Sequence, residues 1–209
     1  AETAYRDLNI ALAHELGDAA DRSGIDFSEV RTAANSQPES DLHIPGVGVG
    51  GHCIPVYPYL FMHGTPGLEL IAHGRELNEQ RPHRYAAMLE FELGSLDKRR
   101  IVILGAAYRP EIGLVAHSSV FDLIDQLTSQ GALVEVLEPF VTDDHLRGHG
   151  LTPGSKDRSY DAALIHTGHQ AFRDPAWHGL APILVDGRGL LVDNPPKRTR
   201  YLAPGFRSG

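Results

Sequence analysis

The pattern that most constrains the fold begins after a polar break at residues 94–100. Short apolar runs typical of buried strands alternate there with turn residues and with a helical repeat. Strands and helices at this spacing indicate parallel βαβ units, so we predict an α/β fold with a small, doubly wound, Rossmann-like parallel sheet over residues 96–209. The tail at 193–209 is rich in Pro, Arg and Gly and is expected to be loosely ordered. The expected strands lie within 99–105, 133–139, 160–169 and 181–189, with a helix at 118–132.

Residues 1–95 carry a helical pattern instead. Apolar residues recur at steps of three and four over residues 1–24, which predicts an amphipathic helix, and a short second helix is expected over 26–35. The helical pattern returns between residues 56 and 93, where Pro82 is expected to begin the last helix. The first half is therefore predicted to be a helical segment.

The composition narrows the classes of function. A net charge of -8 argues against nucleic-acid binding through a basic surface. No apolar run reaches the roughly 18 residues of a membrane span and no signal peptide is visible, so we expect a cytoplasmic protein without a membrane partner. A single cysteine, Cys53, excludes an internal disulfide. The chain opens in helical register without methionine, and we expect it to be part of a longer protein.

The single cysteine follows a run of glycines in the stretch "PGVGVGGHCIPV". Gly46, Gly48, Gly50 and Gly51 permit positive φ angles and close approach of the backbone to a ligand. A cysteine at the end of such a loop is expected to lie near several backbone N–H donors, which favour a thiolate or an oxyanion. The alternative is a buried cysteine that packs as a small apolar side chain, and the residues alone leave both readings open.

Twelve histidines raise the question of a metal site. His145 and His149 are four residues apart, and His166 and His169 are three apart. Neither pair has a cysteine or carboxylate at ligand spacing in a clear motif, so we expect no metal.

Several separate motifs resemble one family, in the same order along the chain. The cysteine loop resembles that of the UDP-glucose/GDP-mannose dehydrogenase family, the nucleotide-sugar 6-dehydrogenases, and most of all the branch acting on UDP-N-acetylmannosamine or UDP-N-acetylglucosamine. The stretches "YRDLNIALAHEL" and "GRELNEQRP" look like helices of its central domain. The resemblance implies a central dimerisation domain at 1–95 and a C-terminal UDP-sugar-binding domain at 96–209. Four stretches of the second half resemble the strand ends of the family's C-terminal domain: "VILGAAYRP", "VEVLEP", "HTGHQAF" and "VDGRG".

The resemblance also implies an activity. Members of this family oxidise a sugar CH2OH to a carboxylate with two NAD+ and no metal, through a cysteine thiohemiacetal and a thioester. Cys53 matches the catalytic nucleophile, the substrate would be a UDP-sugar, and the central helix would form a homodimer. The residues expected to bind substrate are Arg6, Asn9, Gly48, Gly50, Gly51, His52 and Arg109.

Two turns of the second half match the family without an expected role in binding. His169 and Phe172 match one turn after a strand, and Asp186 and Arg188 match another. These four residues are interpreted as structural turn residues.

Other positions depart from the family pattern. The asparagine that helps to hold the oxyanion corresponds to Thr3, and the aspartate that assists the hydrolytic water corresponds to Tyr57, whose phenol is a poor base near neutral pH. An arginine offered across the subunit contact corresponds to Glu39. No GxGxxG turn occurs, so NAD is expected to be bound mainly by an N-terminal domain absent from these 209 residues.

Two functions from different classes follow from these observations. The first is the central and C-terminal part of a UDP-sugar 6-dehydrogenase, with Cys53 catalytic in the full-length protein and this chain alone inactive. The second is a catalytically silent homologue that binds a nucleotide sugar or serves as a dimer scaffold. Cys53 and its glycines favour the first, whereas Thr3, Glu39 and Tyr57 favour the second.

Overall fold

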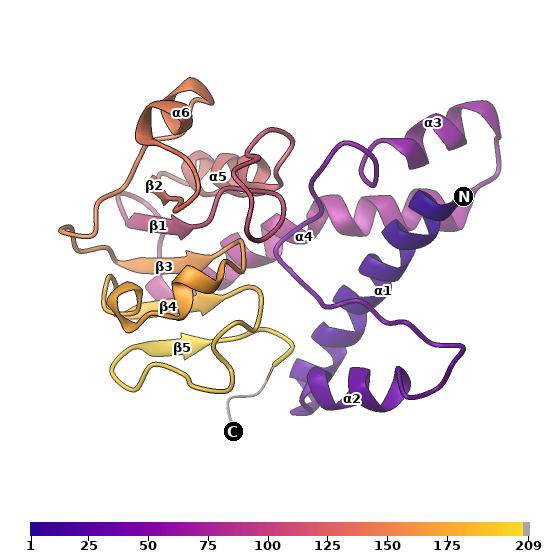
Figure 1. The fold of residues 1–209 in the computed structure, drawn as a ribbon, viewed down its shortest axis with the longest axis horizontal. Coiled ribbons are helices and arrows are strands. Elements are labelled where there is room, and N and C mark those ends of the chain that lie inside the picture. Colours follow the sequence, from indigo (N-terminus) through magenta and orange to yellow (C-terminus); the bar gives the residue numbers. More distant parts are fainter. Residues whose placement is uncertain (207–209) are drawn as a thin grey trace.

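The computed structural model describes residues 1–206 and shows two unequal parts that lie side by side. Helices form one part and a five-stranded sheet with its covering helices forms the other (Figure 1). The predicted fold class, a helical segment followed by a parallel α/β sheet, is confirmed.

The helical part is built on two long helices that cross. Helix α1 (Glu2–Ser23) ends at Gly24, which adopts the left-handed conformation with φ 66°, and α2 (Phe27–Ala34) begins after Asp26, whose carboxylate accepts a hydrogen bond from the Ser28 amide. Helices α3 (Tyr57–Gly64) and α4 (Glu69–Leu93) follow the glycine loop.

A buried polar contact joins α1 to α4. The carboxylate of Asp7 accepts hydrogen bonds from Arg75 at 2.5 Å and from Asn78 at 2.8 Å, and all three side chains are buried. A buried charge is tolerated only when it is paired in this way, so these three residues fix how the two helices cross.

The prediction that Pro82 begins a helix is wrong, because α4 continues through it without a break. Proline removes one backbone N–H donor inside a helix and costs about 3 kcal/mol. Tertiary contacts on both sides hold the helix together. Arg81 donates to the Gly46 carbonyl oxygen at 2.9 Å and pairs with Asp18, and Tyr85 is buried against the sheet.

The sheet has the order β2-β1-β3-β4-β5, with all neighbours parallel. The chain therefore changes direction between β1 and β3, which is the switch point at which α/β sheets of this kind bind ligands. The strands are β1 (Arg100–Leu104), β2 (Leu133–Leu137), β3 (Ala162–Ile165), β4 (Ile183–Asp186) and β5 (Arg200–Leu202).

The expectation of a loosely ordered tail is wrong for strand β5. Its residues pair with β4 in register, Arg200 opposite Ile183, and the Arg200 guanidinium forms an ion pair with Glu92 near the end of α4. Part of that predicted tail, residues 207–209, lies outside the described residues.

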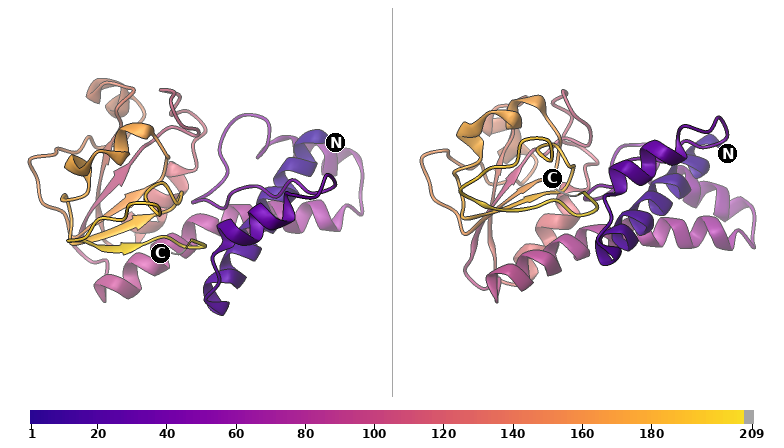
Figure 2. Two further views of the ribbon diagram at one scale, coloured as in Figure 1. Left: turned by 60° about the horizontal axis from the view of Figure 1, so that its bottom comes forward. Right: turned by 90° about the horizontal axis from the view of Figure 1, so that it is seen from below.

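Two apolar clusters cover the two faces of the sheet. On one face α5 (Val120–Ser129) and the second half of α4 supply Leu123, Tyr85 and Leu89. On the other face the short helices η1 (Gln170–Arg173) and η2 (Pro175–Trp177) supply Phe172 and Trp177. Helix α6 (Asp143–Gly148) follows β2, and its Leu146 belongs to the first cluster. Figure 2 shows α4 reaching from the helical part to the sheet, so this helix belongs to both parts and sets their relative placement. None of the helices within residues 1–206 has the length and apolar character that crossing a bilayer requires.

Candidate functional site

A cavity of about 600 Å³ lies between the helical part and the sheet. One wall is the face of α1 that carries residues 6, 10 and 14, and the loop at 43–54 forms a second wall. The third wall follows β1 and β4, at the carboxyl end of the sheet. The lining residues are Arg6, Ile10, His14, Arg31, His43, Ile44, Gly48, Val49, Gly50, Gly51, His52, Cys53, Ile54, Tyr108, Arg109 and Arg188.

The structure brings most of the sequence-predicted site residues together in this cavity. Cys53, Arg6 and Arg109 come from three separate segments, and all three line it. The loop residues 48, 50, 51 and 52 line it as well. Asn9 is the exception: its amide donates to the Asp41 carbonyl oxygen at 2.6 Å and its oxygen accepts from the His43 amide. Asn9 therefore holds the start of the loop in place from outside the cavity.

The glycines serve a different purpose from the one expected for most of them. Of the four loop glycines at 46, 48, 50 and 51, only Gly51 has a positive φ, 99°. Gly46, Gly48 and Gly50 are instead required because the loop lies flat against the sheet part: added Cβ atoms would lie 2.1 Å from Arg188 Nη1, 2.7 Å from Ser119 Cβ and 2.8 Å from the His117 carbonyl oxygen, respectively. The close approach is thus to the second half of the protein.

Cys53 is exposed at the edge of this cavity, so the alternative of a buried, apolar cysteine is wrong. The expected backbone donors around its sulfur are not observed within residues 1–206. The Gly51 amide donates instead to the His117 carbonyl oxygen at 2.8 Å, and the Cys53 carbonyl oxygen accepts from the Tyr57 amide at 2.9 Å, where α3 begins. The thiol therefore reaches the cavity because the backbone of the loop is held in place, and not because hydrogen bonds hold the sulfur.

The cavity is strongly basic although the chain as a whole is acidic. Four arginines and three histidines line it, and no carboxylate occurs among the lining residues that the structure describes. Arg31 donates to the Leu42 carbonyl oxygen and Arg6 pairs with the exposed Glu2. Over residues 1–206 the guanidinium groups of Arg109 and Arg188 have no hydrogen-bond or ion-pair partner. Unpaired guanidinium donors at a cleft are suited to a phosphate or other anion.

Arg188 was interpreted from the sequence as a turn residue together with Asp186, and the structure separates the two. Asp186 is buried and its carboxylate accepts hydrogen bonds from Arg188 N, Leu191 N and Tyr201 Oη, as a turn residue does. The Arg188 side chain, by contrast, is half-buried and points to the cavity. The position of the Arg188 side chain follows from its tertiary contact with Gly46, which the sequence alone does not show.

His14 was missed in the sequence analysis. It lies on α1 four residues after Ile10 and eight after Arg6, so helical spacing was the available signal. It is only 4% exposed, and its Nδ1 has no hydrogen-bond partner among residues 1–206. Burial, with Arg81 and Arg188 nearby, lowers the pKa of His14 well below its ordinary value, so the imidazole is neutral. The cavity therefore has a buried, uncharged imidazole beside its arginines.

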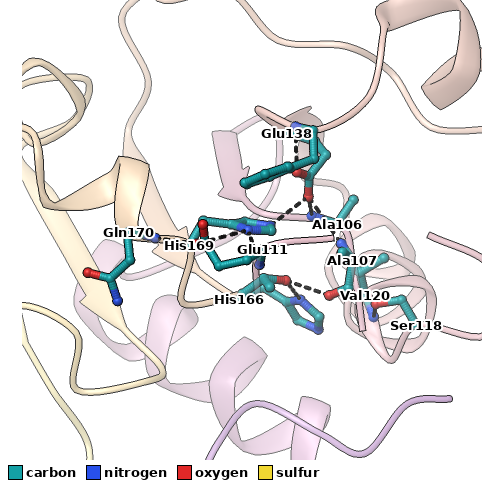
Figure 3. A network of polar contacts seen from close by, with 11 residues as sticks. Ala106, Ala107, Glu111, Ser118, Val120, Glu138, His166, His169 and Gln170 are labelled. Atoms are coloured by element: carbon teal, nitrogen blue, oxygen red, sulfur yellow. Dashed lines mark hydrogen bonds and ion pairs between the residues drawn. The ribbon is translucent and has the colours of Figure 1, made fainter. Parts of the chain in front are cut away.

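A buried polar network shapes the sheet edge of the cavity (Figure 3). Glu138, after β2, accepts hydrogen bonds from the Ala106 amide at 2.8 Å, the Ala107 amide at 3.1 Å and His169 Nε2 at 3.1 Å. His169 Nδ1 in turn accepts from the Glu111 amide at 3.0 Å. Burial alone would raise the pKa of Glu138, but the hydrogen bonds from His169 and Ala106 outweigh it and hold that pKa below its ordinary value.

This network fixes the turn that carries Arg109. The turn runs from Gly105 to Glu111 and is tied to β2 through Glu138 and to β3 through His169. His169 thus has a structural role, in agreement with its interpretation from the sequence. Phe172 is fully buried beneath it and packs on Trp177, as a structural residue would.

A second relay supports the same turn. Ser119 Oγ and His166 Nε2 are 3.0 Å apart, His166 Nδ1 lies 3.0 Å from Thr167 Oγ1, and Thr167 donates to the Ala107 carbonyl oxygen. Burial, with the nearby Arg188, lowers the pKa of His166 to about 3, so this imidazole is neutral. Because Thr167 donates onward, His166 Nδ1 carries the proton and Nε2 accepts from Ser119.

The turn after β1 does not fit the pyrophosphate of a dinucleotide. In a dinucleotide-binding turn the backbone N–H groups face the phosphates. Here Ala106 N and Ala107 N donate to Glu138, a negative charge that occupies the position of the phosphate. Gly105 has φ 91° and a Cβ there would lie 2.5 Å from Thr167 Cβ, so this glycine is needed for packing. The amides of Ala106 and Ala107 are therefore not available to bind the pyrophosphate of NAD.

The three positions that depart from the family pattern are all absent from the lining of the cavity. Tyr57 is the first residue of α3, is 48% exposed and is not among the residues that line the cavity. Thr3 lies in the first turn of α1. Glu39 lines a second groove, of about 430 Å³, between α1, α4 and residues 39–42. Within residues 1–206 no cluster of three or more His, Cys, Asp or Glu residues is placed to hold a metal ion.

Comparison with known families gives two matches that follow each other along the chain. Residues 1–80 match the central domain of the UDP-glucose/GDP-mannose dehydrogenase family, and residues 102–193 match the UDP binding domain of the same family. The segment between the two matches, residues 81–101, contains the second half of α4 and the start of β1.

Individual proteins show the same similarity. The UDP-N-acetyl-D-mannosamine dehydrogenase of Pyrococcus horikoshii is 31% identical over 207 residues, which cover 93% of this chain and 48% of that protein. The UDP-N-acetyl-D-glucosamine 6-dehydrogenase of Salmonella typhi is 32% identical over 82% of this chain and 43% of that protein. The solved structure of UDP-D-ManNAc dehydrogenase from P. horikoshii superimposes with a TM-score of 0.85 at 28% identity, covering all of this chain and 51% of that one. The chain thus spans about half the length of these relatives.

Proposed function

Because this chain belongs to the UDP-glucose/GDP-mannose dehydrogenase family, we propose that it is the central and UDP-sugar-binding part of an NAD-dependent nucleotide-sugar 6-dehydrogenase. One observation carries the proposal: an exposed thiol and two guanidinium groups without a partner in residues 1–206 line the same cavity between the two parts of the molecule. A nucleotide sugar has an anionic diphosphate and a reactive sugar carbon, and this cavity offers a group for each.

In this proposal the guanidinium groups of Arg109 and Arg188 hold the diphosphate. Both lie on the sheet side, at its carboxyl end, where parallel α/β sheets bind ligands. Neither guanidinium has a partner among residues 1–206, so their donors are available to phosphate oxygens. Arg6 and His52, on the helical side and the loop, face the same space and would contact the sugar end. Gly48, Gly50 and Gly51 contribute to substrate binding through the shape of the cavity, because they let the loop pack closely against the sheet part.

Cys53 is proposed as the nucleophile. Its sulfur would bond to the carbonyl carbon of a sugar aldehyde, while the thiol proton passes to the carbonyl oxygen, which gives a thiohemiacetal. The oxidations on either side of this step need a hydride acceptor, and the turn after β1 is not built to hold the pyrophosphate of NAD. We therefore propose that NAD is bound by a further domain of the full-length protein, and that this chain alone is inactive.

The substrate class follows from the relatives as a proposal. The relatives described above are named as dehydrogenases of UDP-N-acetyl-D-mannosamine and UDP-N-acetyl-D-glucosamine, so a UDP-N-acetylhexosamine is the first substrate to test.

A homodimer is proposed through the groove on the other side of α1. Tyr5, Leu12 and Leu70 line this groove and are 57%, 46% and 72% exposed. Apolar exposure concentrated on two long helices is typical of a subunit contact. Glu39 lies at the same groove, where it would face the partner subunit.

A catalytically silent homologue is the second candidate, and the placement of Tyr57 favours it. A phenol at the position of the family's aspartate, exposed and outside the cavity, supplies no base for the hydrolytic water. In this alternative the cavity binds a nucleotide sugar without oxidising it.

One experiment distinguishes the two functions. NADH formation by the full-length protein is measured with UDP-N-acetylmannosamine, UDP-N-acetylglucosamine and UDP-glucose, against a Cys53→Ser variant. The proposal expects NADH with at least one sugar and none from the variant. No cysteine-dependent NADH with any of them, together with measurable UDP-sugar binding, would establish the silent homologue.

A further inference from the structure

His117 lies on the sheet part, in the segment between β1 and α5, and has an unusual backbone conformation. Its φ is 60°, in the left-handed region that residues other than glycine and asparagine rarely adopt. Such a conformation persists only where surrounding contacts hold it, and it often marks a functional position.

Both the backbone and the side chain of His117 contact the glycine loop. Its carbonyl oxygen accepts the Gly51 N–H at 2.8 Å and lies so close to Gly50 that a Cβ there would be 2.8 Å away. Its imidazole packs on the ring of His52, with centroids 4.2 Å apart and planes tilted by 56°. A single residue of the sheet part therefore holds three consecutive residues of the loop, through both its backbone and its side chain.

These three residues come directly before Cys53. The Cys53 backbone is fixed on its other side by the Tyr57 amide, which donates to the Cys53 carbonyl oxygen. The sulfur itself has no hydrogen bond from residues 1–206. The position of the thiol is thus set by its chain neighbours. His117 holds these through a backbone hydrogen bond and its ring, and Tyr108 packs against Gly50 and Gly51 as well.

We propose that His117 is a positioning residue for Cys53, which it holds against the cavity through its contacts with Gly51 and His52. His117 itself lies outside the lining of the cavity. The role in catalysis rests on the proposed function, because a shift of about 1 Å in a reacting group costs on the order of 100-fold in rate. The positioning itself is independent of any substrate.

The single cysteine provides a direct readout on this chain. The rate of Cys53 alkylation by iodoacetamide, at fixed pH and without ligand, reports how the thiol is held. Three variants separate the causes. His117→Asn removes the ring and suits the left-handed backbone, His117→Phe keeps an aromatic ring at His52, and Lys98→Asn makes the same backbone change at another positive-φ residue, with φ 58°, far along the chain from the loop.

The expected result is faster alkylation in His117→Asn, by about 2- to 10-fold, which is what loss of one aromatic pair allows. His117→Phe and Lys98→Asn should keep the wild-type rate, and circular dichroism should show that all three variants fold. In the full-length enzyme His117→Asn should lower kcat and leave KM unchanged. An unchanged or slower alkylation rate in His117→Asn, or an equal change in His117→Phe, would overturn the inference. Because these rates need neither nucleotide nor NAD, failure of the proposed function would not alter them.

Discussion

The guanidinium of Arg188 lies directly against Gly46, so closely that a Cβ on residue 46 would be 2.1 Å from Arg188 Nη1. The two residues belong to different parts of the molecule, the loop before Cys53 and the turn after β4. Their contact ties the shape of the loop to the position of an arginine that the proposed function assigns to the diphosphate.

Gly46→Ala should therefore displace the Arg188 side chain and weaken UDP binding. Loss of a hydrogen bond to a charged group corresponds to about 10- to 100-fold in affinity. The free energy of unfolding should fall by only about 1–2 kcal/mol, because a guanidinium can move aside. Gly179→Ala is the control, since nothing lies within 4 Å of a Cβ there. Isothermal titration calorimetry measures both affinities, and an unchanged affinity in Gly46→Ala would separate Arg188 from the nucleotide.

The buried histidines predict how stability depends on pH. Burial lowers the pKa of His14 well below 6.5 and that of His166 to about 3, so the native state leaves both imidazoles unprotonated. The unfolded chain takes up these protons below about pH 6.5. The free energy of unfolding should therefore decrease as pH falls from 6.5 to 5.

His14→Asn should flatten this decrease by about 1.4 kcal/mol per pH unit, the contribution of one proton. Urea unfolding at several pH values gives the slope. The control is His63→Asn, at an exposed position of α3. An equal slope in wild type and His14→Asn would mean that His14 is protonated in the native protein.

Glu138→Gln should destabilise the protein by about 3 kcal/mol. Both carboxylate oxygens accept only, one from Ala106, Ala107 and His169 and the other from Phe140. An amide places its N–H2 group against at least one of these donors, whichever way it is turned.

The acid side of the stability profile tests the same residue. Because hydrogen bonds hold the pKa of Glu138 below its ordinary value, its carboxylate stabilises the fold above about pH 4.5, and this contribution disappears as pH falls further. Glu138→Gln should lose stability at neutral pH and show a weaker further loss in acid. Glu90→Gln, at an exposed position on α4, is the control, and equal unfolding curves for the two variants would refute the role of the network.

Leu70→Glu should convert the proposed dimer to a monomer. Leu70 is 72% exposed and lines the groove beside α1, so a carboxylate there would be buried in the subunit contact. Phe91→Glu is matched to it, since Phe91 also lies on α4, is 84% exposed and lies outside that groove. Light scattering after gel filtration measures the mass. Dimers in both variants would place the contact elsewhere, and a monomeric wild type would refute the dimer.

Much of the fold could be predicted because local signals and tertiary structure agree. The apolar runs before Gly105 and Gly187 are buried strands, and the repeat around Leu123 is a buried helical face. The two failures have tertiary causes. Pro82 remains in a helix because Arg81 and Tyr85 are anchored on other segments. Strand β5 has only three residues, none of them buried, and it is ordered by pairing with β4.

Only the part of the site that lies in one continuous sequence motif could be predicted from the sequence. Cys53 and the loop before it stand in one continuous stretch, which could be read directly. His14, His117 and Arg188 reach the cavity or the loop from three distant segments. Their roles depend on burial and on contacts between the two parts, and neither is encoded in local spacing.

The central claim is that a nucleotide sugar binds in the cavity that Cys53 and the unpaired arginines share. The most direct measurement is the rate of Cys53 alkylation by iodoacetamide with saturating UDP-N-acetylmannosamine or UDP-N-acetylglucosamine. The account predicts that at least one of them slows alkylation several-fold while the same sugar without UDP has no effect. Alkylation at the same rate with and without both nucleotide sugars would contradict it.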